Sequence, residues 1–81
     1  MDIVLVEWLD SRHGEGWIRL EEVQADLAPT RCESVGWLIS QDNDSITLAG
    51  HCADNPKQVC GDMTIPAKAV LSITRLQKLG V

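Results

Sequence analysis

Short apolar segments separated by turn residues are the feature that most restricts the fold of this 81-residue chain. Each segment is rich in Val, Ile, Leu or Thr and is bounded by Gly, Pro, Asn or Asp, a pattern typical of β-strands joined by tight turns. One domain is expected at this length, spanning residues 1–81. The expected strands are residues 3–9, 32–40, 45–52, 58–65 and 70–76.

The connections between these segments indicate how the strands follow one another. Leu20, Val23 and Leu27 fall at helical spacing and predict a short helical segment after the first strand. Asp42–Asp44 has strong turn chemistry and predicts a hairpin, and Ala67–Ala69 is long enough only for a 3-10 turn before the last strand. Consecutive antiparallel strands of this kind predict a mainly β fold, a small five-stranded antiparallel barrel, followed by a frayed tail over residues 77–81.

The first strand is apolar on both faces. Alternation places Val4, Val6 and Trp8 on one face and Ile3, Leu5 and Leu9 on the other. A strand with two apolar faces is covered twice or lies at a contact between subunits. We therefore expect Ile3 and Leu5 to lie at a subunit contact.

Tryptophan is the only aromatic residue of the chain, which has three Trp and no Phe or Tyr. Trp8 and Trp37 alternate in phase with the apolar positions of their strands, so we expect both in the core, with Val35 and Ile39 on the same face as Trp37. Gly36 is expected to allow the bend that closes a small barrel. Trp17 follows a glycine-containing loop, and two interpretations stay open for it: a lid on the core or an exposed binding residue.

The charge of the chain is negative and unevenly spread. Twelve acidic residues against seven basic ones give a net charge of −5, which makes nucleic acid an unlikely partner because binding to it depends on basic side chains. Residues 1–54 hold eleven acids and three bases, and the remainder is basic overall. Lys57, Lys68 and Arg75 could hold a small anionic ligand, although scattered solubility charges are the simpler interpretation. No segment reaches the roughly 18 apolar residues of a membrane span, and no secretory signal is recognised, so we expect a cytoplasmic protein.

His51, Cys52 and Cys60 are the candidate metal ligands of the sequence. Zinc sites use four convergent ligands, usually with paired spacing, and no such pair exists here. A Cys52–Cys60 disulfide across a hairpin is an alternative, but unpaired thiols are favoured. We therefore expect neither a bound metal nor another cofactor.

The loop after the first strand collects polar side chains that could bind a ligand or partner. Asp10, Ser11 and His13 include the residue types of a hydrolase triad, but true triads assemble from separate rigid elements, and a local turn is the better interpretation. We therefore expect no catalysis. The loop's candidate binding residues are Asp10, Ser11, Arg12, His13 and Trp17.

The stretch from Val35 to Leu76 resembles small SH3-like and Sm-like barrels. The glycine-containing segment Ser34–Leu38, the hairpin on Asp42–Asp44 and the ending Gly61–Val70 carry this resemblance. That ending looks like the strand, 3-10 turn and strand that complete such folds. The resemblance implies assembly into rings or dimers through edge strands.

Two further segments, Trp8–Ser11 and Gly16–Trp17, make the chain similar to short uncharacterised proteins of bacteriophages and prophages. This resemblance implies a location in the host cytoplasm. The base-stacking aromatic and Asn-rich loop residues of RNA-binding Sm proteins are not matched, which argues against an RNA-binding ring.

These observations predict a non-enzymatic binding module that forms a homo-oligomer. The expected partner is a host protein or a small anionic ligand such as a nucleotide, held in pockets between subunits. The alternative is a monomeric adaptor or inhibitor that presents the acidic face of Glu21, Glu22 and Asp26 to a partner protein.

Overall fold

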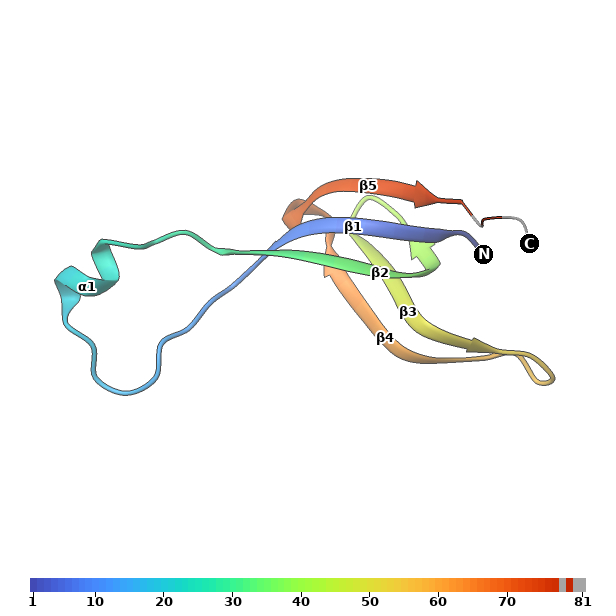
Figure 1. Ribbon diagram of the computed structural model, residues 1–81, viewed down its shortest axis with the longest axis horizontal. Coiled ribbons are helices and arrows are strands. Elements are labelled where there is room, and N and C mark those ends of the chain that lie inside the picture. The colour runs from blue at the N-terminus through green and yellow to red at the C-terminus, as the bar shows by residue number, and fades with distance from the viewer. Residues whose placement is uncertain (78, 80–81) are drawn as a thin grey trace.

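A single antiparallel sheet of five strands organises the protein in this computed structural model, which describes residues 1–77 and 79. The strands follow the order β4-β3-β2-β1-β5 across the sheet (Figure 1). The five strands predicted from the sequence are confirmed, and each observed boundary lies within two residues of the expected one. Their bounds are β1 Ile3–Asp10, β2 Thr30–Gln41, β3 Ser45–Ala53, β4 Gln58–Pro66 and β5 Val70–Leu76.

The sheet is open, so the expected closure into a barrel is not confirmed. β4 and β5 lie at the two ends of the strand order, and the described residues of one do not pair with those of the other. Instead, β3 and β4 run obliquely to β1 and β5 and continue as a protruding hairpin (Figure 1). The 3-10 helix η1 (Ala67–Ala69), which was expected, contacts both β1 and β3 and links the two halves of the curved sheet.

The core lies on the concave side of the curved sheet and is small and aliphatic. The face of β1 that holds Val4, Val6 and Trp8 points into it, as the alternation predicted. No polar or charged residue is buried among the described residues. Its buried members are Val4, Val6, Ile46, Leu48 and Ile65, and Trp8, Leu38, Met63, Ala69 and Val70 pack against them.

Trp8 joins the core through packing and through a hydrogen bond. Its indole Nε1 donates to Ser34 Oγ at 3.0 Å, across the pair of β1 and β2. The expectation that Trp8 is a core residue is therefore confirmed. The bond also satisfies the one polar group of the indole in a half-buried position.

The predicted inward face of β2 is wrong. Trp37 pairs with Ile3 and Val35 pairs with Leu5, so both lie on the face of the sheet opposite to Val4 and Val6. Leu38 contacts the core instead. Because β2 is apolar on both sides around residues 35–39, its alternation alone does not identify the buried face.

Gly36 is buried where β2 and β3 approach each other closely. A Cβ atom at this position would lie 2.8 Å from the carbonyl oxygen of Ala49. The glycine is therefore required by the close approach of the two backbones. A register irregularity two residues later, between Leu38 and Ser40, accompanies the change of strand direction.

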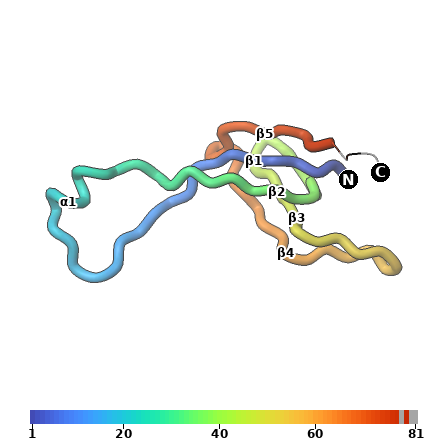
Figure 2. The backbone as a smooth tube through the Cα atoms, viewed as in Figure 1, coloured from blue at the N-terminus to red at the C-terminus, as the bar shows by residue number. Residues whose placement is uncertain are grey.

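The segment between β1 and β2 projects away from the sheet, and residues 11–29 are called the arm below. It contains the helix α1 (Leu20–Gln24), the short helical segment expected from the spacing of Leu20, Val23 and Leu27, although it ends before Leu27. β1 and β2 stay paired up to Asp10 and Thr30, so the arm begins where this ribbon ends (Figures 1 and 2). Every residue from Leu9 to Arg31 is exposed, which means that the arm does not pack on the sheet.

The dimensions of the molecule reflect these two projections. Its radius of gyration is 16.6 Å, whereas a compact domain of this length has about 12 Å. The principal extents are 53 × 30 × 23 Å. Within the described residues, no helix combines the length and apolar character needed to cross a membrane.

Candidate functional site

The arm is held in shape by contacts within itself. Arg12 Nη1 donates to Asp26 Oδ2 at 2.7 Å, and a second guanidinium nitrogen donates to the Asp26 carbonyl oxygen. This ion pair joins the outgoing and returning halves of the arm around α1. Both partners are well exposed, so the pair contributes at most about 1 kcal/mol.

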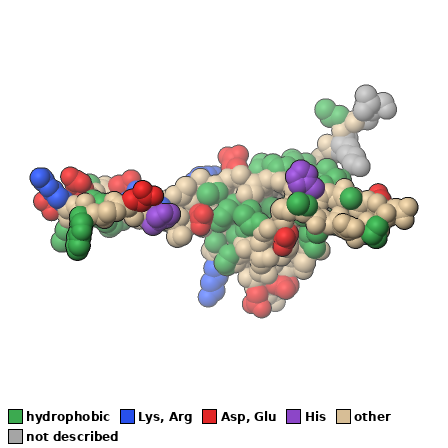
Figure 3. Space-filling model, turned by 90° about the horizontal axis from the view of Figure 1, so that it is seen from below, with side chains coloured by type: hydrophobic (Ala, Val, Ile, Leu, Met, Phe, Trp, Pro, Cys, Tyr) green, Lys and Arg blue, Asp and Glu red, His purple; other side chains and the backbone are tan. Residues whose placement is uncertain are grey.

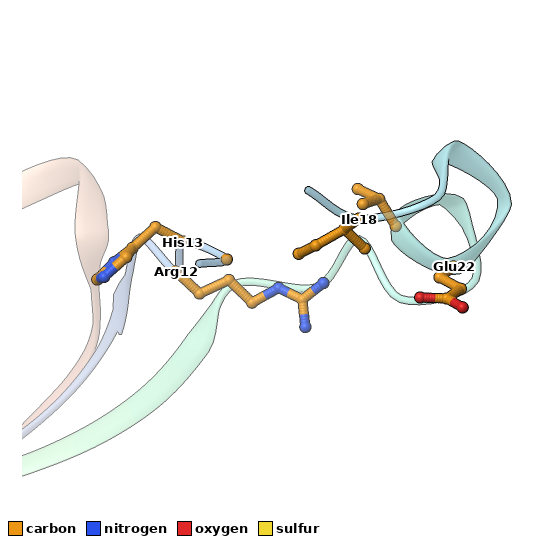
Figure 4. A pocket seen from close by; sticks show the side chains of 6 residues that line it. Arg12, His13, Ile18 and Glu22 are labelled. Carbon is orange, nitrogen blue, oxygen red and sulfur yellow. The ribbon is translucent and has the colours of Figure 1, made fainter. Parts of the chain in front are cut away.

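A shallow hollow of about 280 Å³ lies inside the bend of the arm (Figure 4). The Arg12 side chain extends along it, whereas the His13 ring points away from Glu22 in the same view. Because Asp26 already pairs with Arg12, the guanidinium is partly neutralised. The hollow is smaller than most small-molecule sites, which begin at about 300 Å³. Its lining residues are Arg12, His13, Gly14, Ile18, Glu22 and Val23.

Trp17 lies at the surface of the arm with 104% of its area exposed. Of the two interpretations open for this residue, the core lid is wrong; Trp17 is exposed, and its role in binding stays a prediction. Trp17 belongs to a series of exposed large apolar side chains along the arm, and this series is called the arm stripe. The arm stripe consists of Trp17, Ile18, Leu20, Val23 and Leu27.

A second apolar surface lies on the face of the sheet that turns away from the core. The pairings Leu76 with Ile3, Ile3 with Trp37, and Leu5 with Val35 place these five side chains side by side across β5, β1 and β2. Val35 is 59% exposed, while Ile3, Leu5 and Trp37 are half-buried. We call these five residues the outer patch. It contains Ile3 and Leu5, the residues expected at a subunit contact.

Hydrophobic side chains lie at the surface of both the sheet and the arm. Figure 3 shows hydrophobic side chains on the body and on the arm, separated by a narrow neck. Sequence reasoning missed Val35, Trp37 and Leu76 as members of a surface. The available signal was that β2, like β1, is apolar on both of its faces. Only the register of β1 and β2 shows that the outward apolar residues of the two strands lie next to each other in one patch.

The three basic residues proposed to hold an anion do not converge within one chain. Lys57 follows β3 at the tip of the protruding hairpin, and Lys68 lies in η1, at the opposite end of β4. Lys57 Nζ donates to Asp54 Oδ1 at 3.0 Å. This hydrogen bond raises the pKa of Lys57, and the interaction with the Cys52 side chain raises it further. Arg75 Nε lies 3.4 Å from Asp2 Oδ2.

The candidate metal ligands are divided between the two faces of the β3–β4 hairpin. His51 pairs with Cys60 on one face, whereas Cys52 pairs with Val59 on the other. The three cysteines of the chain are not joined in disulfides. No group of three or more metal-ligating side chains occurs among the residues that the structure describes.

The polar loop at the base of the arm makes a local turn. The Ser11 backbone N–H donates to Asp10 Oδ1 at 2.8 Å, which is the turn interaction expected from the sequence. The Asp10 carboxylate is thus engaged by the chain itself. Glu21 and Glu22, in the first turn of α1, are exposed beside the arm stripe, so the acidic face expected on the helical segment is present.

Comparison of the chain with protein-family models, with curated proteins and with solved structures gave no match in any of the three.

Proposed function

We propose that this protein is a non-enzymatic binding module that self-associates and uses the arm to hold its partner. The observation that carries the proposal is the amount of surface left exposed. A folded monomer of 8.9 kDa exposes about 4,800 Å², whereas this chain exposes 6639 Å². The difference is about 1,800 Å², estimated from the same scaling of area with mass.

This difference matches the size of a protein interface. Standard interfaces bury about 800 Å² on each partner, and permanent ones bury more. Large apolar side chains are exposed in two separate places, the arm stripe and the outer patch. Large apolar patches on small soluble proteins mark interaction sites. The surface therefore supports a macromolecular partner over a small molecule.

A thin core supports self-association in particular. Five buried side chains form the centre of the described core cluster, and domains of this size commonly gain stability from oligomerisation. Association would cover apolar surface that the single chain leaves in water. The SH3-like or Sm-like resemblance and the phage-type assignment, with its location in the host cytoplasm, belong to the same proposal. The five-stranded antiparallel sheet and η1 are compatible with that resemblance.

Sedimentation equilibrium over a range of protein concentrations tests the proposal. The expected result is a dimer or larger assembly at micromolar concentration, with a compact shape for its mass. Native mass spectrometry of the same sample reports the subunit count and any bound small molecule. A monomer at all concentrations would overturn self-association.

A second candidate function is the binding of a small anion such as a nucleotide. The observation that favours it is the arm hollow, which the Arg12 side chain lines (Figure 4). Lys57, Lys68 and Arg75 would join such a site only if several copies brought them together. Calorimetric titration with pyrophosphate and with ATP tests this function. Equal affinity for wild type and Arg12→Ala would remove the hollow as the site.

The adaptor function differs in the surface that it uses. It requires the acidic side chains of α1, namely Glu21 and Glu22, and Asp26 after the helix. Charge reversal at Glu21 and Glu22 should then abolish capture of a basic partner protein. Self-association through apolar contacts would persist in the same variant, so the two functions give opposite results. The net charge of −5 continues to disfavour an RNA-binding ring.

A further inference from the structure

Two apolar surfaces of the same chain are wholly or partly exposed to solvent within the residues that the structure describes, and they lie toward opposite ends of β1. The outer patch includes Ile3 and Leu5, near the beginning of the strand, and the arm follows Asp10 at its end. Asp10 is seven positions after Ile3 along the strand, which corresponds to about 23 Å. The two surfaces are therefore well separated within one molecule.

The ribbon that carries the arm points it away from its own outer patch. β1 and β2 are paired through Asp10 and Thr30, and an ion pair between Glu7 and Arg31 joins the strands just before the arm (Figure 2). Only residues 25–29 connect α1 to Thr30. To place α1 on the outer patch of the same chain, this connection would have to reverse direction and reach nearly its full extension of about 3.5 Å per residue.

A second copy of the chain receives the arm without such a reversal. Each copy offers one arm stripe and one outer patch, so a two-fold contact covers both surfaces of both chains at once. Any other single partner would have to provide a cover for two distant surfaces. The excess area of about 1,800 Å² per chain lies in the range of permanent interfaces.

We propose that two copies of this protein exchange arms, with the arm stripe of each lying on the outer patch of the other. This inference rests on the self-association proposed above and names the surfaces that meet. Trp17 and Leu27, the most exposed members of the arm stripe, lie against Val35 and Trp37 of the second copy. Glu21 and Glu22 stay at the solvated rim of the contact, where interfaces are polar.

The chemistry of the two surfaces suits this contact. Trp17 has a large apolar area with two rotatable angles, the kind of side chain that dominates interfaces. The outer patch contains no charged side chain among its five members, and the nearest one along β1, Glu7, already pairs with Arg31. Glu33, which lies opposite Glu7 on the same face, is exposed next to Val35 and would stay in water at the rim of the contact.

A mixing experiment with two variants tests the exchange. Trp17→Ser impairs the arm stripe and Val35→Ser impairs the outer patch. Both side chains are well exposed, so both variants keep the sheet fold, which circular dichroism checks. We expect the dissociation constant of each variant alone to be at least tenfold higher than that of wild type. An equimolar mixture should associate more tightly than either, because the intact arm of one chain meets the intact patch of the other.

The control is Leu71→Ser, which removes an apolar side chain of comparable exposure outside both surfaces. It should leave the dissociation constant unchanged.

The possible outcomes distinguish the exchange of arms from self-association in general. A wild-type protein that is monomeric at all concentrations overturns both. Association that survives both Trp17→Ser and Val35→Ser keeps self-association but overturns the arm exchange. Loss of association in both variants without recovery in the mixture also overturns the exchange. A monomer whose Trp17 is shielded from a fluorescence quencher would show docking on the same chain.

Discussion

The arm and the sheet contain the same kinds of apolar residues but differ in what holds them. In the sheet, Ile65 is 1% exposed and packs in a core built from three strands, β1, β3 and β4. In the arm, Leu27 is 71% exposed, and the described contacts are an ion pair and the backbone bonds of a five-residue helix. An isolated helix of this length is not stable in water. The difference teaches that the sheet is stabilised by a shared core, whereas the arm is held only by local contacts that are exposed to solvent.

The largest expected effect comes from removing the same side chain in each region. Ile65→Ala should lower the free energy of unfolding by about 2–5 kcal/mol, because it leaves a cavity in a thin core. Ile18→Ala, the matched change in the arm, should alter it by less than about 0.5 kcal/mol at concentrations where the chain is monomeric. Urea unfolding followed by circular dichroism measures both. Equal losses would mean that the arm packs on the sheet in solution.

A smaller effect is expected at the hydrogen bond that anchors Trp8 in the core. Ser34→Ala removes the acceptor of the Trp8 indole N–H, which should lower the free energy of unfolding by about 1 kcal/mol. Thermal unfolding measured by Trp fluorescence reports the change. Ser72→Ala is the control, because this serine is exposed on the edge strand β5. A loss below a few tenths of a kcal/mol would show that water replaces the bond.

Breaking the ion pair inside the arm should affect stability still less. Arg12→Ala removes the bond to Asp26, and exposed pairs of this kind contribute about 0.2–1 kcal/mol. Because the ion pair orders only the arm, the free energy of global unfolding should fall by an amount at the low end of this range. Amide hydrogen exchange should instead increase in α1 and stay unchanged in β1 and β3. Faster exchange throughout the sheet would contradict the separation of the two regions.

The smallest effect concerns the turn between β2 and β3 and appears as a pH dependence. Asp42 Oδ1 accepts hydrogen bonds from the backbone N–H of Asp44 at 2.8 Å and of Ser45 at 2.9 Å. These bonds lower the pKa of Asp42 below its ordinary value of 3.8. The folded state therefore gains stability from the ionised carboxylate above that value, and the gain is lost as the pH falls through the lowered pKa.

Comparison of Asp42→Ala with wild type at several pH values tests this dependence. The variant should be less stable at pH 7, and the difference should shrink below pH 4, where the wild-type carboxyl becomes protonated. Glu15→Ala is the control, since this arm carboxylate lies outside the β2–β3 turn. A difference that stays constant down to pH 2 would assign the effect to the turn backbone and not to the charge.

Local patterns in the sequence were sufficient to predict the positions of the strands and turns. β-branched runs and the turn residues around Asp42 place all five strands, because strand formation and turn chemistry depend on neighbours in the chain. The same patterns located η1 and the irregular segment that became the arm. They also identified Ile3 and Leu5 as a second apolar face of β1. The use of that face as an interface stays a prediction.

Local sequence patterns could not predict which face of β2 points into the core, or whether the sheet closes. The alternation over residues 35–39 favours the face of Trp37, with Val35 and Ile39 beside it, so only pairing with β1 decides that Leu38 faces the core and Trp37 does not. Likewise, nothing local indicates that β3 and β4 continue as a free hairpin instead of closing on β5. The sites share this limitation, because Lys57, Lys68 and Arg75 look alike in the sequence but lie on separate elements.

The sequence by itself therefore determined the elements, their order and the apolar surplus of the first strand, since these depend on residues that are neighbours along the chain. Tertiary structure alone decided that Gly36 permits a close approach of β2 to β3, and that Val35, Trp37 and Leu76 join Ile3 and Leu5 in one patch. It also decided that Trp17 extends into solvent. Register and the direction of the β1–β2 ribbon bring distant residues together or keep them apart, and no local pattern specifies either.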